Sequence, residues 1–324
     1  ILLKEMNKIF GFLKLIRIKN LLIIALLQIL IKYTLINIYL ENYQLDNLLF
    51  FIYLFTLLFV VAGGYIINDI FDVDTDQINK KNIINNIISI KNAKNSYVIM
   101  NFLTIIGTTL LVIKTNNIIS IFIFLFYIIS LYKYSQVFKK QFLIGNIQVA
   151  FLTAFSIVNL ILLDLLNENN QNDYSKKTIV KIILIYTLFS FITTLVREII
   201  KDIEDIEGDK KIKARTIPIA LGMIHSKRIV TILLTITIAG LMLIQYFQYS
   251  FILSDFEIEI SIWGLNKISF IYVTILQLLL FLLLFYLNKS KYKKDFYFLS
   301  QLLKALMLVA ILSIPVFSYF HLKC

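Results

Sequence analysis

The chain has 324 residues, of which 59% are hydrophobic and only 16% are charged. Its mean hydropathy is +0.82, and a soluble protein of this size could not bury so much apolar surface in one core. The composition also excludes a disordered chain and a fibrous repeat, and a single cysteine, Cys324, excludes a disulfide scaffold. We therefore expect an integral membrane protein.

The net charge is +12, from 32 Lys and Arg against 20 Asp and Glu. In a soluble protein such an excess would suggest a nucleic-acid partner. Membrane proteins, however, collect Lys and Arg in their cytoplasmic loops. The basic balance is thus explained by the bilayer, and no nucleic-acid partner is expected.

Apolar runs of about 20 residues, long enough to cross ~30 Å of hydrocarbon, recur along the chain. We predict nine spans, at Leu21–Leu40, Leu48–Ile67, Ser96–Ile113, Ile118–Tyr134, Phe142–Leu163, Thr178–Val196, Ile229–Tyr246, Ile268–Leu287 and Tyr297–Phe320. With a cytoplasmic N-terminus, most basic residues fall in the inner segments, which is the usual arrangement. This predicts an integral cell (inner) membrane protein whose second-to-third and sixth-to-seventh connections face the cytoplasm.

The first of these connections opens with an acid cluster, N-D-I-F-D-V-D-T-D over residues 68–76. If the preceding helix continues through it, the 3.6-residue period places Asn68, Asp69, Asp72 and Asp76 within an arc of about 100°. Carboxylates crowded on one helix face repel one another and need a compensating cation.

The other connection opens with a second acid cluster, R-E-I-I-K-D-I-E-D-I-E-G-D over residues 197–209. Glu198, Asp202, Asp205 and Asp209 follow the spacing i, i+4, i+7, i+11 and would form a stripe along one helix. A single cluster of this kind could be a solvated face paired with lysines. Two of them on one side of the membrane favour a functional site.

Magnesium is the cation that best suits these clusters. The D-x-D-x-D run at 72–76 resembles the start of a calcium loop, but Gln77 and Ile83 stand where that loop needs Gly and Glu. The two histidines, His225 and His321, lack the spacing of zinc ligands. Mg²⁺ needs few carboxylates and readily binds phosphate oxygens, so two facing clusters could hold Mg²⁺ around a diphosphate.

The motif N-D-x-x-D-x-x-x-D after the second span, with D-x-x-x-D (Asp205, Asp209) after the sixth, resembles the UbiA superfamily of intramembrane prenyltransferases. The resemblance covers nearly the whole chain. It implies a single domain over 1–324, with an all-α fold of nine transmembrane helices around a central lipophilic pocket. It also implies an enzyme that binds Mg²⁺ and the diphosphate of an isoprenyl donor through the two motifs.

The same resemblance implies roles for individual residues. The metal ligands would be Asp69, Asp72, Asp76, Asp202, Asp205 and Asp209, with Asp72 and Asp205 essential for catalysis. Substrate-binding residues would be Asn20, Asn68, Tyr134, Lys139, Asn146, Arg197, Lys201 and Arg215. Tyr134 and Lys139 resemble a Y-x-x-x-K element with one extra residue between them, and Arg17 with Asn20 resembles an R-x-x-N element. Ordinary cytoplasmic-loop charge remains an alternative explanation for Arg197, Lys201 and Arg215, as helix capping does for Asn146.

The stretch R-E-I-I-K-D-I-E-D-I-E-G-D is most similar to the branch of the family that prenylates a prenylated glycerol phosphate. The resemblance therefore implies a lipophilic acceptor of that kind, with an aromatic prenyltransferase of quinone biosynthesis as the alternative. An ion-coupled transporter is a third possibility. It would place acids near the bilayer midplane and break its helices with Gly or Pro, whereas the acids here lie at the ends of the predicted spans.

Overall fold

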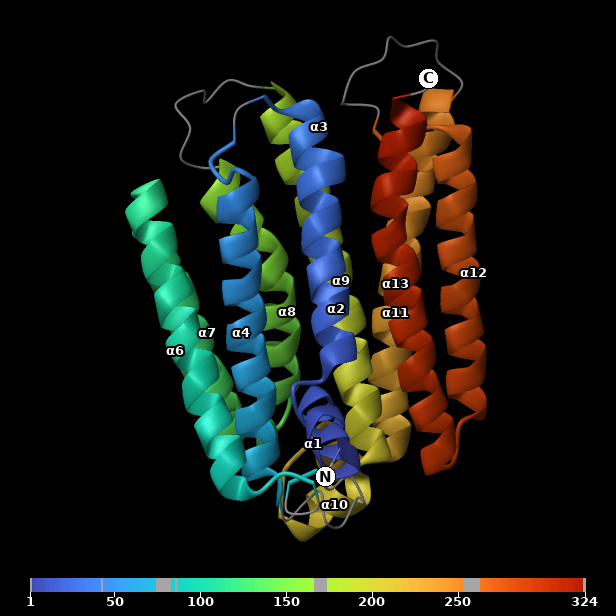
Figure 1. Ribbon diagram of the computed structural model, residues 1–324. Helices are drawn as coiled ribbons and strands as arrows, with labels where there is room; N and C mark the ends of the chain where they lie inside the picture. Colours follow the sequence, from blue (N-terminus) through green and yellow to red (C-terminus); the bar gives the residue numbers. More distant parts are fainter. Residues whose placement is uncertain are drawn as a thin grey trace.

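The computed structural model describes residues 2–41, 43–73, 83–84, 87–165, 174–252 and 263–322. Within these ranges the chain is almost entirely helical and forms one bundle (Figure 1). Asp76, one of the predicted metal ligands, lies outside the described residues.

Nine stretches of the described chain are long and apolar enough to cross a membrane, which confirms the predicted number. The first is composite, with α2 (Ile18–Leu30) followed by the π-helix η1 (Ile31–Ile36) and α3 (Asn37–Tyr39). The others are α4 (Asn47–Phe71), α6 (Ile90–Thr115), α7 (Ile119–Gln136), α8 (Ile144–Leu160) with the π-helix η3 (Ile161–Leu165), α9 (Tyr174–Glu204), α11 (Ile217–Ile252), α12 (Lys267–Lys289) and α13 (Lys293–His321).

Short polar residues start several of these helices by accepting hydrogen bonds from otherwise unpaired backbone N–H groups. The Asp46 carboxylate accepts from the amide of Leu49 at the start of α4. The Asn266 side chain accepts from the amide of Ser269 at the start of α12. These caps define where the membrane-crossing segments begin.

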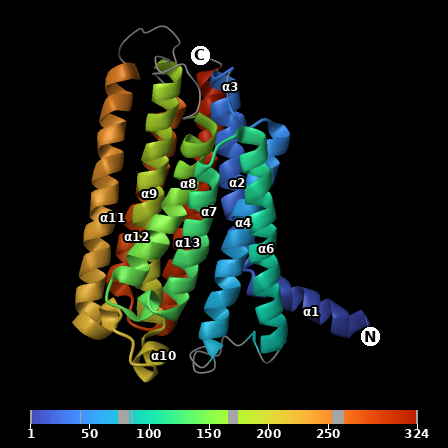
Figure 2. The ribbon, with the colours of Figure 1, turned by 90° about the vertical axis from the view of Figure 1, so that its left-hand side faces the viewer.

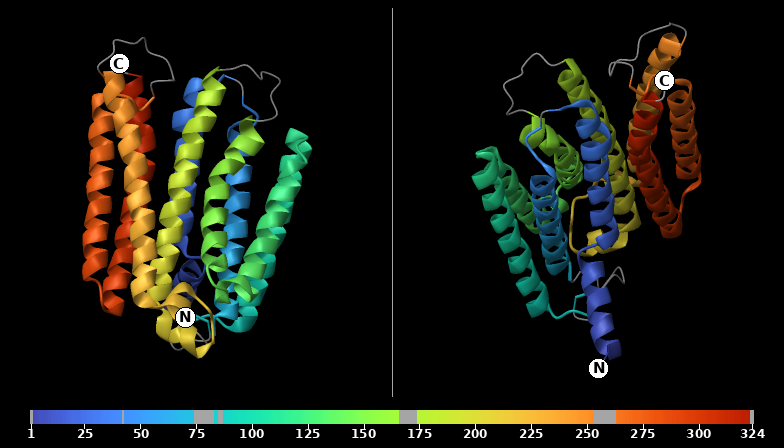
Figure 3. Two further views of the ribbon diagram at one scale, coloured as in Figure 1. Left: turned by 180° about the vertical axis from the view of Figure 1, so that it is seen from behind. Right: turned by 45° about the horizontal axis from the view of Figure 1, so that its top comes forward.

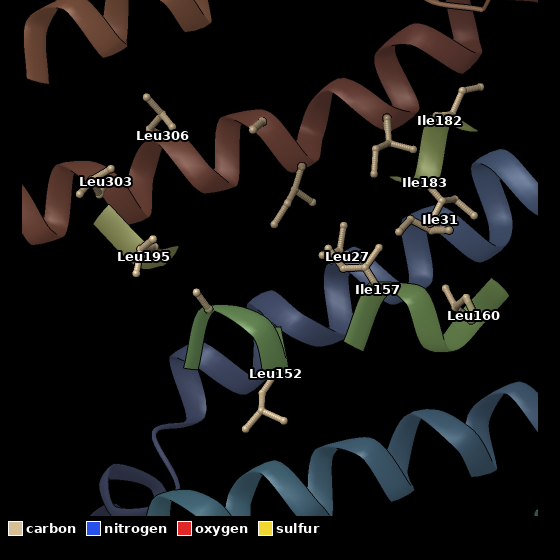
Figure 4. Close-up of a cluster of buried hydrophobic side chains, with 14 of the residues drawn as sticks. Leu27, Ile31, Leu152, Ile157, Leu160, Ile182, Ile183, Leu195, Leu303 and Leu306 are labelled. Carbon is tan, nitrogen blue, oxygen red and sulfur yellow. The ribbon is translucent and has the colours of Figure 1, made fainter. Parts of the chain in front are cut away.

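The interior of the bundle is packed with branched aliphatic side chains. Figure 4 shows Leu27 and Ile31 from the first span near Ile157 of α8, with Ile183 of α9 and Leu303 of α13 in the same cluster. Outward-facing side chains are also apolar. Val98, Phe102 and Ile113 of α6 are 64%, 60% and 65% exposed, which is the pattern expected of a surface that faces lipid rather than water.

One end of the bundle carries the helix breaks. The helix α1 (Leu2–Leu15) is separated from α2 at Arg17, whose φ is 52°, and it projects from the bundle in Figure 2. At this same end α9 finishes and a short helix, α10 (Ile206–Lys211), turns below the bundle (Figure 3). Gly222, with φ 81°, then bends α11, a conformation that a residue with a side chain rarely adopts. We refer to this end as the α1 end.

The opposite end is held by a fully buried ion pair. Lys32 Nζ, in η1, lies 2.6 Å from Asp164 Oδ2, in η3, and both side chains are 0% exposed. Asp164 Oδ1 also accepts from the amide of Leu45, and the Lys32 ammonium lies 3.8 Å from the centre of the Tyr43 ring. A charge buried in a membrane span needs such partners, so the pair fastens the first and fifth spans together.

Candidate active site at the α1 end

The first acid cluster lies at the C-terminus of α4. Asn68 and Asp69 occupy the last turn of the helix, and Asp72 caps it one residue after Phe71. All three acid-cluster side chains are buried, and Asn68 Nδ2 donates to Asp72 Oδ2 at 2.8 Å. The carboxylates thus project from the C-terminal end of α4.

The second acid cluster does not form one continuous helical stripe, and that expectation is wrong. Helix α9 ends at Glu204, Asp205 adopts a non-helical φ of −99° and ψ of 10°, and Asp209 lies in α10. Stacking carboxylates on successive turns of one helix is unfavourable, and the turn at Asp205 takes the last two acids off the face that carries Glu198 and Asp202.

Lys139 connects the two acid clusters. It lies in η2 (Phe138–Lys140), between α7 and α8, and its ammonium forms an ion pair with Asp72, 67 residues away in the sequence. The same ammonium lies 3.5 Å from Asn68 Oδ1, and its charge also acts on Asp209. The element with the irregular Y-x-x-x-K spacing therefore does reach the acid clusters.

Asp209 is a buried carboxyl outside the membrane spans. Burial raises its pKa to about 6, with Asp205 adding to the rise and Lys139 opposing it. A carboxyl with this pKa is partly protonated near neutral pH, as is common for acids in functional sites.

The polar residues around Asp202 complete this side of the site. Asn146, buried at the start of α8, donates from Nδ2 to Asp202 Oδ2 at 2.8 Å. The half-buried Tyr134 lies within electrostatic range of both Asp72 and Asp202. Tyr134 and Asn146 therefore belong to the same site as both acid clusters.

A basic side faces the acids. Arg17 Nη2 donates to Asp69 Oδ1 at 3.0 Å, and the guanidinium lies 4.8 Å from the centre of the Tyr65 ring. Asn20 donates to the Tyr65 hydroxyl at 3.2 Å and accepts from Lys304 Nζ at 2.9 Å. The site thus includes the start of the first span and the middle of the last.

On α9, Glu198 holds two basic neighbours. Its carboxylate accepts from Arg197 Nη1 at 3.0 Å and from Lys201 Nζ at 2.9 and 3.0 Å. Glu198 is buried, whereas its partners retain partial exposure. Both predicted substrate-binding residues of α9 therefore lie in the site.

Two predicted residues are more peripheral. Asp205 is 23% exposed, with its Oδ1 4.0 Å from Lys293 Nζ. The Arg215 side chain is exposed, and its backbone N–H donates to the carbonyl of Lys140. This bond ties the segment before α11 to the connection that carries Lys139.

The sequence interpretation assigned no role to Lys304 or Glu198. The signal for Lys304 was present, because an ammonium within the long apolar run of α13 is costly unless it has a function or a partner. For Glu198 the sequence pattern predicted only that it shares a helix face with Asp202. Its ion pairs with Arg197 and Lys201 are seen in the structure.

Within the described residues, no group of three or more His, Cys, Asp or Glu side chains is gathered closely enough to hold a metal ion. The carboxylates of Asp69 and Asp72 instead pair with Arg17 and Lys139. The donors are all oxygen atoms, which suit Mg²⁺, and the Lys139 ammonium already supplies a positive charge to both acid clusters.

The chain matches the model of the UbiA prenyltransferase family over residues 31–302. It is 38% identical over 99 residues to digeranylgeranylglyceryl phosphate synthase of Sulfurisphaera tokodaii, a match that covers 30% of this chain and 34% of that protein. This stretch spans about a third of the relative's length.

Solved structures of similar fold cover almost the whole chain. One, of digeranylgeranylglyceryl phosphate synthase in membranes, has a TM-score of 0.58 and 26% identity and covers 96% of this chain and 98% of that one. Another, a UbiA homologue from Archaeoglobus fulgidus bound to DMAPP and Mg²⁺, has a TM-score of 0.59 at 16% identity, with 94% and 99% covered. The second similarity concerns the fold alone.

Proposed function

This chain belongs to the UbiA prenyltransferase family, and we propose that it transfers an isoprenyl group from an allylic diphosphate to a lipophilic acceptor that carries a glycerol phosphate. The observation that carries this proposal is the meeting of two acid clusters, from α4 and from α9–α10, through Lys139 at one end of a bundle whose described part has nine candidate spans.

Magnesium fits the residues that meet there. Asp72, Asp202, Asp205 and Asp209, with Asp69 and Asp76, would hold it through carboxylate oxygens. When bound, Mg²⁺ supplies positive charge that neutralises a diphosphate leaving group. In our proposal Lys139 moves its ammonium from Asp72 to the phosphate oxygens, because the two cations would otherwise compete for the same carboxylate.

In the reaction, the bond between the allylic carbon and the diphosphate oxygen breaks, and its electron pair leaves with the diphosphate. An acceptor hydroxyl oxygen forms the new carbon–oxygen bond, and the hydroxyl proton is released, so the products are an ether, diphosphate and a proton. Lys139, Asn68 and Tyr134 lie where they can hold the leaving group by charge and hydrogen bonds.

A glycerol phosphate acceptor is favoured over an aromatic one. Relatives that match this chain are digeranylgeranylglyceryl phosphate synthases, and the basic residues of α9 and α13 offer counter-charges for a phosphate.

We further propose that the α1 end faces the cytoplasm. A Cys324→Ser protein with one added cysteine, at exposed Glu207 of α10 or at Leu48 of α4, tests this with a membrane-impermeant maleimide. Labelling of the Leu48 variant alone in intact cells supports the proposal, and labelling of the Glu207 variant alone refutes it.

The activity itself is tested with purified protein, Mg²⁺ and a radiolabelled allylic diphosphate. We expect diphosphate release and an ether product with a geranylgeranyl ether of glycerol phosphate, and neither with 4-hydroxybenzoate. Product with the aromatic acceptor alone would overturn the acceptor class. Release that is unchanged by Asp72→Asn would overturn the proposed mechanism.

A further inference from the structure

Four basic side chains that do not share a carboxylate with Lys139 gather at the α1 end. They are Arg17, Arg197, Lys201 and Lys304, and we refer to them as the basic cluster. They come from three parts of the chain: the junction of α1 and α2, the end of α9, and α13. Lys304 lies within electrostatic range of the other three and of Glu198.

The basic cluster has more positive charge than its acidic neighbours balance. Arg17 pairs with Asp69, and Arg197 and Lys201 share the single carboxylate of Glu198. The Lys304 ammonium has a neutral hydrogen-bond partner, the Asn20 oxygen. Four cations share two ion-paired carboxylates, Asp69 and Glu198, and the nearby carboxyl of Asp202, which interacts with Lys201, still leaves the cations in excess.

The cluster also has unused hydrogen-bonding capacity. Arg197 Nε is buried and has no hydrogen-bond partner among the described residues. A guanidinium offers five N–H donors in a planar arrangement that matches carboxylate and phosphate oxygens. The Arg197 side chain is 15% exposed and that of Lys201 is 29% exposed, so both remain accessible to a ligand.

A phosphate monoester has the charge and the acceptors that this arrangement lacks. It carries about −1.5 to −2 charges near neutral pH and three strong acceptor oxygens. The donor diphosphate is already provided for at the acid clusters, where Lys139 pairs with Asp72. The basic cluster is therefore available for the other anionic substrate group.

We propose that Arg197, Lys201 and Lys304, with Arg17, bind the phosphate of the acceptor, separately from the donor diphosphate. This inference rests on the proposed function, which it deepens by assigning the two phosphate-bearing ends of the substrates to two subsites. Asn20 holds the Lys304 ammonium toward α2, and Glu198 keeps Arg197 and Lys201 side by side until the acceptor arrives.

The test is a binding measurement that does not require turnover. A geranylgeranyl ether of glycerol phosphate and the same ether without its phosphate are titrated into protein in nanodiscs, without donor. The wild type should bind the phosphorylated ether more tightly by roughly 10- to 100-fold, because hydrogen bonds to charged groups are strong. Lys304→Gln and Lys201→Gln should each remove most of this preference. The exposed Lys133→Gln, at the same end of the bundle, should retain it.

The ratio of the two affinities is unaffected by any loss of folded protein, since both ligands are measured on the same sample. A wild type that binds both ethers equally would overturn the inference, as would Lys304→Gln and Lys201→Gln proteins that retain the full preference. Failure of the proposed function has a different signature, namely no diphosphate release from the donor with any acceptor. In that case the affinity ratio still decides whether the basic cluster binds a phosphate.

Discussion

The ammonium of Lys139 and the carboxylate of Asp72 form an ion pair that joins the connection after α7 to the end of α4. Because the same ammonium acts on Asp209, it lies between the two acid clusters, where we propose that the metal and the donor diphosphate bind. The proposed function gives this lysine two successive partners, namely the Asp72 carboxylate before the donor binds and the phosphate oxygens afterwards.

Replacing Lys139 by Gln should therefore have opposite effects on metal and on donor. Binding of Mn²⁺, used as a probe for Mg²⁺, should be unchanged or tighter, because no ammonium competes for Asp72. The KM for the allylic diphosphate should rise by roughly 10-fold or more, because a charged contact to the phosphate is lost. Lys140→Gln, an exposed neighbour, is the matched control. Weaker Mn²⁺ binding in Lys139→Gln would contradict this account.

Carboxylate-to-amide variants distinguish the acids that we propose to bind metal from other acids of the chain. Asp72→Asn and Asp209→Asn should lower the rate of transfer by on the order of 100-fold or more, since they weaken neutralisation of the leaving group. Mn²⁺ binding, measured by electron paramagnetic resonance, should weaken in parallel.

Asp46→Asn is the matched control for these variants, because Asp46 caps α4 at the opposite end of the bundle and Asn is an equally good cap. A comparable loss of activity in this variant would show that the effect of amide substitution is general rather than local.

The raised pKa of Asp209 predicts how metal affinity depends on pH. Burial raises this pKa to about 6, so below pH 6 a metal ion has to displace a proton. Mn²⁺ affinity should fall by up to about tenfold for each pH unit below 6, and Asp209→Asn should remove this slope.

The raised pKa of Asp209 also determines how the stability of the metal-free protein changes with pH. Between about pH 4 and 6 the folded state binds a proton that the unfolded state has released, so stability falls as the pH rises through this range.

The buried pair of Lys32 and Asp164 predicts a large effect on stability at the far end of the bundle. Asp164→Leu leaves an unpaired buried ammonium and should lower the free energy of unfolding by about 3–5 kcal/mol. The double variant Lys32→Met with Asp164→Leu should recover most of this loss, because two apolar side chains can replace a buried ion pair. Unfolding in a denaturing detergent gives both values. An Asp164→Leu protein as stable as the wild type would show that the pair contributes little. A double variant no more stable than the single one would show that the unpaired ammonium is not the cause of the loss.

Much of the fold could be predicted from the sequence, because a membrane span has a length and composition that few other segments share. All nine predicted runs correspond to helices of the structure. Asp69, Asp72 and Asp202 were selected as candidates for a similar reason, since acids beside such runs are costly without a function, and the structure places them at one end of the bundle. The turn at Asp205 was not predictable, because the i, i+4, i+7 spacing is equally compatible with an unbroken helix.

The contacts of Lys139 and Lys304 were beyond the sequence for another reason. Lys139 meets Asp72 across 67 residues, and Lys304 meets Asn20 across 284. Such pairs are set by how the helices pack, and the local pattern of apolar residues carries no information on which spans are neighbours. The extra residue in the Tyr134–Lys139 spacing is absorbed by the 3₁₀ turn η2.

The π-helical segment η1 has a consequence for how the first span tolerates changes in length. Its hydrogen bonds run from i to i+5, so it accommodates one residue more than an α-helix of the same rise. Deleting one residue within Ile31–Ile36 would shorten the wide turn to a normal one and leave Asn20 facing Lys304. The same deletion in the α-helical part, between Leu22 and Ala25, would rotate Asn20 by about 100° about the helix axis relative to Lys32. A deletion in η1 that spares Lys32 is therefore expected to preserve the position of Asn20, whereas a deletion nearer the candidate active site is not.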